Sequence, residues 1–252
     1  MIAIVRHGAR EDDSSSKKRR SEVTYDPALS RLGEEQSRIT GRYFANTYLS
    51  VKNSTPAKHV KILASPFLRT LQTAVIIARE LNIKGIQVWD PLCEELSDDI
   101  FDSFPLPKIN YYSKSNGFIC NNFLRGDDVK ITKMEDPERI LLACHYPEKK
   151  ENRRSNLPQV RARIALNYII NTQLLNIDKN TEPNREIKQA PHGDFTEMII
   201  LVSHAFFLLP FVKYFSPEDN YKDRDYCAIS VAKKINSEDW KIIEECSSEH
   251  LK

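Results

Sequence analysis

Short apolar runs alternate with longer amphipathic stretches along most of the chain, and this alternation predicts the fold. Buried strands are predicted at residues 1–6, 60–64, 86–90 and 197–203. The spacing of apolar residues predicts helices at residues 30–50, 65–83, 158–175 and 205–215. Residues 227–246 are predicted to form a closing hairpin. The pattern favours an α/β protein, a three-layer α/β/α sandwich around a mostly parallel central sheet.

Two of the predicted helices carry signals for their buried face or their first turn. The buried face of the helix at 30–50 is expected to include Leu32, Ile39, Tyr43 and Phe44. In the helix at 65–83, Ser65 is expected to be the N-cap, because Pro66 then takes the first helical position, which suits proline. Arg69 would then lie on the first turn of that helix.

Two segments interrupt the alternation. Residues 11–27 are charged and rich in serine, and we expect a solvated loop there with the basic run Lys17–Arg20 at its centre. Residues 96–157 combine prolines, aromatic residues and asparagines without a long periodic run, so we expect an irregular insertion or lid. No linker or internal repeat divides the chain, and residues 1–252 are expected to form a single domain.

Composition narrows the classes of function. Of 252 residues, 40% are apolar and 29% are charged, as in globular proteins. Lysine and arginine exceed aspartate and glutamate by only two, so net charge supports neither nucleic-acid binding nor a membrane surface. No run approaches the ~18 apolar residues that span a bilayer. The five cysteines are widely spaced and the first strand leaves no room for a secretory signal, so we expect a cytoplasmic or nuclear protein with reduced thiols.

Basic side chains follow three of the predicted strands. Arg6 and His7 come directly after the first strand, Arg69 follows the second, and His204 follows the fourth. In open α/β sheets the ligand crevice lies beyond the carboxyl ends of the strands, so these side chains are expected to face one crevice. The sequence therefore predicts a binding site at this edge of the sheet.

Arginine and histidine in one crevice suit a phosphoryl group. A guanidinium group binds phosphate oxygens through two parallel hydrogen bonds, and the N-terminus of the helix at 65–83 would add its amides. Nearby positive charge lowers the pKa of a histidine, so His7 would stay neutral and could attack phosphorus. Glu94 and Glu95 follow the third strand and could reach the rim of the crevice.

Two other phosphatase chemistries have little support. Cysteine-dependent phosphatases need an arginine six positions after their cysteine, and those positions here hold Asp99, Gly126, Lys150, Lys233 and Lys252. The histidines and acids also lack the spacing of metal ligands, so we expect neither a metal nor another cofactor. The other histidines are expected on the surface or in loops: His59, His145, His192 and His250.

Five motifs, in order, resemble the histidine phosphatase superfamily, also called the phosphoglycerate mutase-like family. They are VRHGAR (5–10), LSRLGEEQSRITGRYF (29–44), LASPFLRTLQTA (63–74), LCEEL (92–96) and LVSHA (201–205). Within the family, RHGAR and SPFLRTLQTA make the chain most similar to the eukaryotic branch of ubiquitin-associated and SH3-containing protein tyrosine phosphatases. The resemblance implies a phosphoglycerate mutase-like fold.

The resemblance also implies a role for each candidate residue. His7 would attack phosphorus and become phosphohistidine. The phosphoryl oxygens would be held by Arg6, Arg10, Arg69 and His204. Glu94 would protonate the leaving group and then help to activate water, with Glu95 as the alternative.

By the same resemblance, the protein is expected to be a phosphomonoesterase that acts on a phosphorylated protein or small molecule. The more specific expectation is that its substrates are phosphotyrosine proteins. Ala205 stands where the family usually has glycine, and Asp13 stands where mutases usually carry asparagine. An acid there would disfavour a carboxylated substrate. The alternatives are a phosphoglycerate mutase or sugar-phosphate phosphatase, and a non-catalytic module that binds a phosphorylated partner. The oligomeric state stays open.

Overall fold

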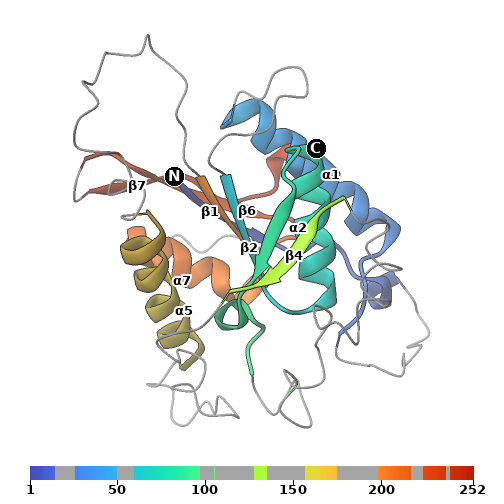
Figure 1. The fold of residues 1–252 in the computed structure, drawn as a ribbon, viewed down its shortest axis with the longest axis horizontal. Helices are drawn as coiled ribbons and strands as arrows, with labels where there is room; N and C mark the ends of the chain where they lie inside the picture. The colour runs from blue at the N-terminus through green and yellow to red at the C-terminus, as the bar shows by residue number, and fades with distance from the viewer. Residues whose placement is uncertain are drawn as a thin grey trace.

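A seven-stranded sheet runs through the described part of the chain (Figure 1). The computed structural model describes residues 1–14, 26–49, 60–96, 105, 128–134, 157–174, 198–216, 224–236 and 239–252. The strands are β1 (Ile2–Arg6), β2 (Val60–Ala64), β3 (Gly85–Val88), β4 (Lys130–Lys133), β5 (Met198–Ser203), β6 (Ile229–Lys234) and β7 (Trp240–Ser247). Their order is β4-β3-β2-β5-β1-β6-β7. The strands from β4 to β1 pair in parallel, and β6 and β7 are antiparallel.

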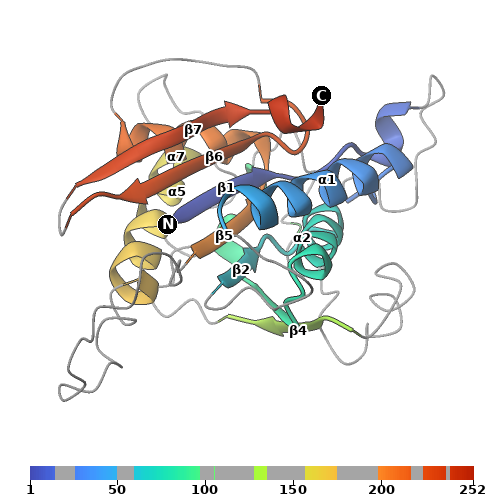
Figure 2. The ribbon, with the colours of Figure 1, turned by 90° about the horizontal axis from the view of Figure 1, so that it is seen from above.

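Helices cover both faces of the sheet, as Figure 2 shows from above. One face carries α1 (Arg31–Thr47) and α2 (Leu68–Glu80), and the other carries α5 (Leu157–Tyr168) and α7 (Ala205–Phe215). The short helices are η1 (Glu11–Ser14), η2 (Asp90–Leu92), the π-helix η4 (Ile169–Leu174) and η5 (Glu249–Leu251). The predicted three-layer sandwich with a mostly parallel sheet is confirmed.

The strands contribute side chains to two apolar cores, one on each face of the sheet. In β1, Ala3 and Val5 belong to the core under α1 and α2, whereas Ile2 and Ile4 belong to the core under α5 and α7. This division follows from the alternation of side chains along a strand. Because both faces are covered, central strands are apolar throughout, and all six residues of β5 are buried.

The buried face of α1 differs from the one predicted. Phe44 is fully buried, but Leu32 is 63% exposed, and Ile39 and Tyr43 are only partly buried. Small and polar residues occupy most of the buried face: Gly33, Ser37, Thr40, Gly41 and Ala45. The prediction for Leu32 was wrong because the buried face of α1 is centred on Gly33, Ser37 and Thr40, and Leu32 lies to one side of it. Close packing at Gly33 also excludes a larger side chain there. A Cβ atom added at Gly33 would lie 2.1 Å from the carbonyl oxygen of Ala9.

The first turn of α2 also differs from the prediction. The helix begins at Leu68, and its N-cap residue Phe67 makes no capping hydrogen bond through its side chain. Ser65 is therefore not the N-cap. Instead, the buried carboxylate of Asp26 accepts hydrogen bonds of 2.9 and 3.1 Å from the amide of Leu68, which satisfies one of the free donors at this helix end. The expected solvated loop at 11–27 was wrong for Asp26, which is 4% exposed.

The remaining predicted elements agree with the structure within a few residues. The helix predicted at 158–175 is α5 followed by η4, and the closing hairpin is β6–β7. Within the expected insertion at 96–157, residues 130–133 form the edge strand β4. Most of that insertion and the basic run Lys17–Arg20 lie outside the described residues. Among the described helices, none has the length and apolar character needed to cross a bilayer.

The contact between α1 and the loop after β1 leads to a test with matched glycines. Gly33→Ala should lower the free energy of unfolding by roughly 1–3 kcal/mol, because its Cβ would meet backbone atoms that cannot move aside. Gly85→Ala is the control, since its Cβ would lie 3.6 Å from the nearest atom, at ordinary contact distance. Urea unfolding of both variants measures the difference, and equal stability would contradict this account of the packing.

Candidate active site

The candidate site lies where the central strands end. Beyond β1, the amide of His7 donates to the carbonyl of Ser203 at 3.0 Å. Beyond β2, the amide of Ser65 donates to the carbonyl of Val202 at 2.9 Å. The backbone pairing of the sheet therefore continues past the strands into the loops that carry the polar side chains. The backbone at His7 and Ser65 is therefore held in place by hydrogen bonds to β5.

The backbone and ring of His7 are held by several polar contacts. Its carbonyl accepts a hydrogen bond of 3.2 Å from the amide of Cys227, and the next amide, that of Gly8, donates to the hydroxyl of Thr73. The ring nitrogen Nδ1 lies 2.9 Å from the carbonyl oxygen of Gly8. Because a carbonyl only accepts, Nδ1 carries the proton, and the lone pair of the neutral ring sits on Nε2. Burial lowers the pKa of His7 well below its usual range, and the charge of Arg69 lowers it further.

Arg69 is the centre of the cluster. Its Nε donates to His7 Nε2 at 3.2 Å, and its Nη2 lies 3.1 Å from Glu94 Oε2. Its Nη1 faces the buried carboxylate of Asp26 at 3.4 Å. The Arg69 side chain is only 3% exposed and that of Asp26 is fully buried. One guanidinium group therefore links the loop after β1, the start of α2 and the loop after η2.

His204 and Glu94 complete the cluster on the other side of Arg69. His204 Nδ1 lies 3.1 Å from Arg69 Nη2 and 3.0 Å from Glu94 Oε2. Its Nε2 lies 2.8 Å from the hydroxyl of Ser65, so the residue predicted as a helix cap contacts the site histidine instead. Burial lowers the pKa of His204 to about 4, although the neighbouring carboxylate of Glu94 opposes this shift. His204 is therefore neutral near pH 7.

Glu94, rather than Glu95, faces the two histidines. Burial alone would raise the pKa of Glu94, but His204 and Arg69 together hold it well below its usual range. Its second oxygen, Oε1, accepts a hydrogen bond of 3.1 Å from the backbone amide of Glu95. One oxygen of this carboxylate is thus directed at the cluster, and the lowered pKa favours its ionised form.

Arg6 borders the cluster beside Tyr226. The Arg6 Cζ atom is 3.9 Å from the centre of the Tyr226 ring, and that ring is 5.6 Å from the His7 ring. Arg6 also donates to the carbonyl oxygen of Arg224. Its Nε is buried, and no described residue accepts a hydrogen bond from it. This donor is thus available to an oxygen atom of a ligand.

Arg10 does not join the cluster directly. Its guanidinium pairs with Asp12 and with Asp13, each at 3.0 Å. The Asp13 carboxylate also accepts a hydrogen bond from the hydroxyl of Tyr226. Arg10 is therefore connected to Arg6 through Asp13 and Tyr226, and its side chain is 34% exposed.

The ligand atoms that could hold a cation are already occupied by the guanidinium group. Atoms of His7, Glu94 and His204 lie within 4.8 Å of one another, close enough to share a metal ion. All three are within 3.2 Å of a nitrogen of Arg69. A cation bound there would have to displace a buried positive charge, so these residues are better suited to bind an anion through Arg69.

Two site residues escaped the sequence analysis. Asp26 lies in a serine-rich, charged stretch, and only its position in space reveals its contact with Arg69. Tyr226 precedes the hairpin and belongs to none of the recognised motifs. No local pattern distinguishes either residue, because both act on groups more than 40 positions away in sequence. His250, expected on the surface, is partly buried instead, with Nε2 2.9 Å from Thr40 Oγ1.

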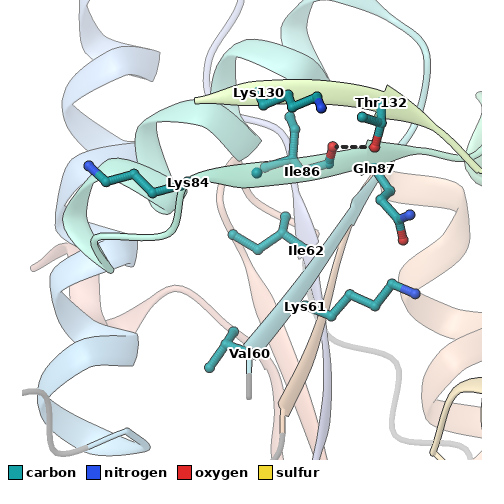
Figure 3. Close-up of a pocket in the computed structure, with 9 residues that line it drawn as sticks. Val60, Lys61, Ile62, Lys84, Ile86, Gln87, Lys130 and Thr132 are labelled. Carbon is teal, nitrogen blue, oxygen red and sulfur yellow. Dashed lines mark hydrogen bonds between the residues drawn. The ribbon is translucent and has the colours of Figure 1, made fainter. Parts of the chain in front are cut away.

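A second hollow lies at the opposite ends of the strands (Figure 3). It occupies about 410 Å³ between β2, β3 and β4. The lining residues are Val60, Lys61, Ile62, Lys84, Gly85, Ile86, Gln87, Lys130 and Thr132. Figure 3 shows the side chains of Lys61 and Lys84 pointing in opposite directions, so its lysines do not converge on one point. The converging donors of the described residues are those around Arg69.

The buried pair of Asp26 and Arg69 leads to a comparison with a surface pair. Asp26→Asn should destabilise the protein by about 3–5 kcal/mol, because it removes the fully buried one of the two carboxylates that balance the buried guanidinium of Arg69. Asp128→Asn removes a partner of Arg79 at an exposed pair and should cost less than about 1 kcal/mol. Chemical denaturation of both variants gives the two values. A loss for Asp26→Asn as small as that for Asp128→Asn would show that Arg69 is held in another way.

The histidine pKa values predict how stability depends on pH. His204 and His250 both have folded-state pKa values near 4, whereas an unfolded histidine titrates near 6.5. Between these values the unfolded chain binds more protons, so stability is full above about pH 6.5 and falls as the pH drops towards 4. Each buried histidine contributes at most about 1.4 kcal/mol per pH unit. Urea unfolding at pH 7.5 and pH 5 should show the fall.

The variant His250→Gln separates one contribution to this slope from the others. It removes a titrating group that contacts Thr40 and Tyr43, and it should reduce the pH dependence while leaving His204 in place. An unchanged slope in this variant would mean that His250 titrates alike in the folded and unfolded chain.

Comparison with known proteins agrees with this geometry. The sequence model of the histidine phosphatase superfamily (branch 1) matches residues 2–98. This segment contains five residues of the site: Arg6, His7, Asp26, Arg69 and Glu94. No curated protein matches the chain by sequence search.

Solved structures extend the similarity to the whole chain. An ecdysone phosphate phosphatase from Bombix mori, in complex with tungstate, is 16% identical and aligns over 98% of this chain and 93% of its own, with a TM-score of 0.56. A phosphoglycerate mutase from Bacillus anthracis str. Sterne is 11% identical over 99% and 94% of the two chains, also at 0.56. A mycobacterial glucosyl-3-phosphoglycerate phosphatase is 14% identical over 98% of each chain, at 0.53. The segment at 2–98 thus matches the model of the histidine phosphatase superfamily, and the solved structures share the fold of the whole chain.

Proposed function

We propose that the protein is a phosphomonoesterase that works through a phosphohistidine at His7. The observation that carries this proposal is the state of the His7 ring. Its proton is fixed on Nδ1 by the carbonyl of Gly8, and its lone pair on Nε2 faces the Nε–H of Arg69. A phosphoryl oxygen that accepts this N–H would free the lone pair and bring phosphorus next to it.

In the first half-reaction, His7 Nε2 attacks phosphorus and the bond from phosphorus to the ester oxygen breaks. Arg69 and the unpaired Nε–H of Arg6 would hold the phosphoryl oxygens, and His204 lies within reach of the same group. Such fixed donors stabilise the charge that develops in the transition state. The leaving oxygen takes up one proton as it departs.

To act as the acid for the leaving group, Glu94 must first take up a proton. Arg69 and His204 keep this carboxylate ionised in the structure. A bound phosphate dianion would draw the N–H groups of Arg69 towards itself and add negative charge nearby, and both changes raise the pKa of Glu94. The substrate can also deliver a proton, since the second pKa of a phosphate monoester is about 6.

In the second half-reaction, water attacks the phosphohistidine and the phosphorus–nitrogen bond breaks. Glu94 accepts the proton of that water, a role that suits an ionised carboxylate beside the cluster. The electron pair returns to His7 Nε2, and Nδ1 keeps its proton throughout. The products are an alcohol or phenol and inorganic phosphate, and the enzyme is regenerated without a metal or other cofactor.

The natural substrate depends on residues around this core. Asp13 places a carboxylate beside Tyr226 and Arg6, which supports a substrate without a carboxylate next to its phosphate and speaks against a phosphoglycerate mutase. The narrower similarity to ubiquitin-associated and SH3-containing protein tyrosine phosphatases, and with it a phosphotyrosine substrate, stays a prediction. The segment at 96–157 that would test it lies mostly outside the described residues.

A non-catalytic phosphate-binding module is the alternative in another class. The retained nucleophile, acid and arginines favour an enzyme, because binding alone needs neither a free lone pair on His7 nor the carboxylate of Glu94. The two functions differ in one observable: an enzyme of this type becomes covalently phosphorylated by its substrate, and a binding module does not.

The test is to trap the intermediate. Rapid quenching after mixing with a ³²P-labelled aryl phosphate should give an acid-labile, alkali-stable label on His7, and His7→Ala should lose both label and turnover. Arg6→Met should lower the rate by roughly 10²–10³ through the loss of one fixed donor. Arg79→Met, at a partly exposed arginine of α2 paired with Asp128, is the matched control and should leave the rate unchanged.

Two outcomes would contradict the proposal. A label on serine or cysteine would exclude a histidine nucleophile, and stable binding of the ester without label or turnover would point to the binding module. Activity should survive excess EDTA, because Arg69 supplies the positive charge. Loss in EDTA that a divalent cation restores would show that a metal takes part.

A further inference from the structure

The loop that carries Glu94 is held by an arginine from a distant helix. Arg161 lies on α5 and is fully buried. Its Nη1 donates to the carbonyl oxygens of Pro91 and Cys93 at 2.8 and 2.9 Å, and its Nη2 donates to the carbonyl of Glu94 at 2.9 Å. Three carbonyl groups of one short loop therefore converge on one guanidinium group.

The same loop is fixed from the sheet. The hydroxyl of Ser203, at the end of β5, donates to the carbonyl oxygen of Leu92 at 2.8 Å. The Arg161 Cζ atom lies 5.0 Å from the centre of the Phe206 ring on α7. The loop thus has polar contacts with both the sheet and α5, and the guanidinium group of Arg161 lies against the Phe206 ring of α7.

We infer that Arg161 is a positioning residue that sets the place of the Glu94 carboxylate. The inference rests on the proposed function, because it concerns the proton transfers assigned there to Glu94. A guanidinium group is planar and offers its N–H groups in a fixed fork, so it can hold several carbonyls in one arrangement. Arg161 donates to the backbone carbonyl of Glu94, and its charge also lowers the pKa of His204. The effect on proton transfer is expected to pass through Glu94, whose loop Arg161 holds.

A positioning role for Arg161 predicts an effect on proton transfer, which a purely structural role would not predict. Glu94 must approach the leaving oxygen in one half-reaction and the attacking water in the other. A carboxylate displaced by about 1 Å transfers protons poorly, and such a displacement can lower a rate by ~10². The displacement should matter most when the leaving group needs a proton, and least for a nitrophenolate, which leaves without one.

The experiment compares two leaving groups in four variants. Arg161→Met should lower kcat/KM for an alkyl phosphate by ~10² and change kcat/KM for nitrophenyl phosphate far less, as Glu94→Gln should also do. The ratio kcat/KM is the quantity to compare because it reports the first half-reaction, in which the two leaving groups differ. Arg163→Met, at an exposed arginine two positions along the same helix, is the matched control and should change neither rate. In the double variant Arg161→Met with Glu94→Gln, removing Arg161 should cause no further loss, because its effect passes through Glu94.

The outcomes separate this inference from the proposed function. Equal loss with both substrates in Arg161→Met, or a further loss in the double variant, would overturn the positioning role and leave the phosphohistidine step intact. If Glu94→Gln showed no preference between the substrates, both the inference and the role of Glu94 would fail. Absence of phosphohistidine in the wild-type protein would instead overturn the proposed function.

A second variant guards against misfolding. If thermal unfolding shows that Arg161→Met does not fold, Arg161→Lys serves in its place, because lysine keeps the charge and loses the fork. It should show the same preference between leaving groups, and full activity of Arg161→Lys on the alkyl phosphate would refute the need for the fork.

Discussion

The buried guanidinium group of Arg69 is the interaction on which the site depends. It contacts the nucleophile candidate His7, the acid candidate Glu94 and the structural carboxylate of Asp26. A buried charge is costly unless it is paired and hydrogen-bonded, so the fold must supply these partners in advance. The same requirement leaves the group rigid, and a rigid donor is the one most useful to a phosphoryl transition state.

Two carboxylates balance the charge of Arg69, and they differ in their surroundings. Asp26 pairs with Nη1 of Arg69 and also accepts hydrogen bonds from the amide of Leu68 on α2, so it is fixed independently of the proposed ligand. Glu94 balances it from the ligand side and can exchange its share of the contact for a phosphoryl oxygen. One counter-charge is structural and the other is replaceable, which lets one arginine serve both stability and binding.

Much of this arrangement could be predicted from the sequence. His7, Arg69, Glu94 and His204 follow strands, and parallel strands end at one edge, so their proximity follows from the strand pattern alone. The exposed Leu32 and the buried Asp26 could not be predicted in this way. Leu32 fits a helical apolar pattern, but it lies to one side of the buried face of α1. Asp26 sits in a polar stretch, and its burial depends on the position of α2.

The position of β1 in the sheet has a consequence for synthesis and folding. The first strand of the chain lies between β5 and β6, which follow it by about 200 residues. Pairing over such separations closes large loops and slows folding. A chain emerging from the ribosome therefore carries His7 without its neighbours until β5 and the Cys227 amide have been made. The apolar strand β1 therefore stays unpaired until β5 has been made, and an unpaired apolar strand of this kind is prone to aggregation.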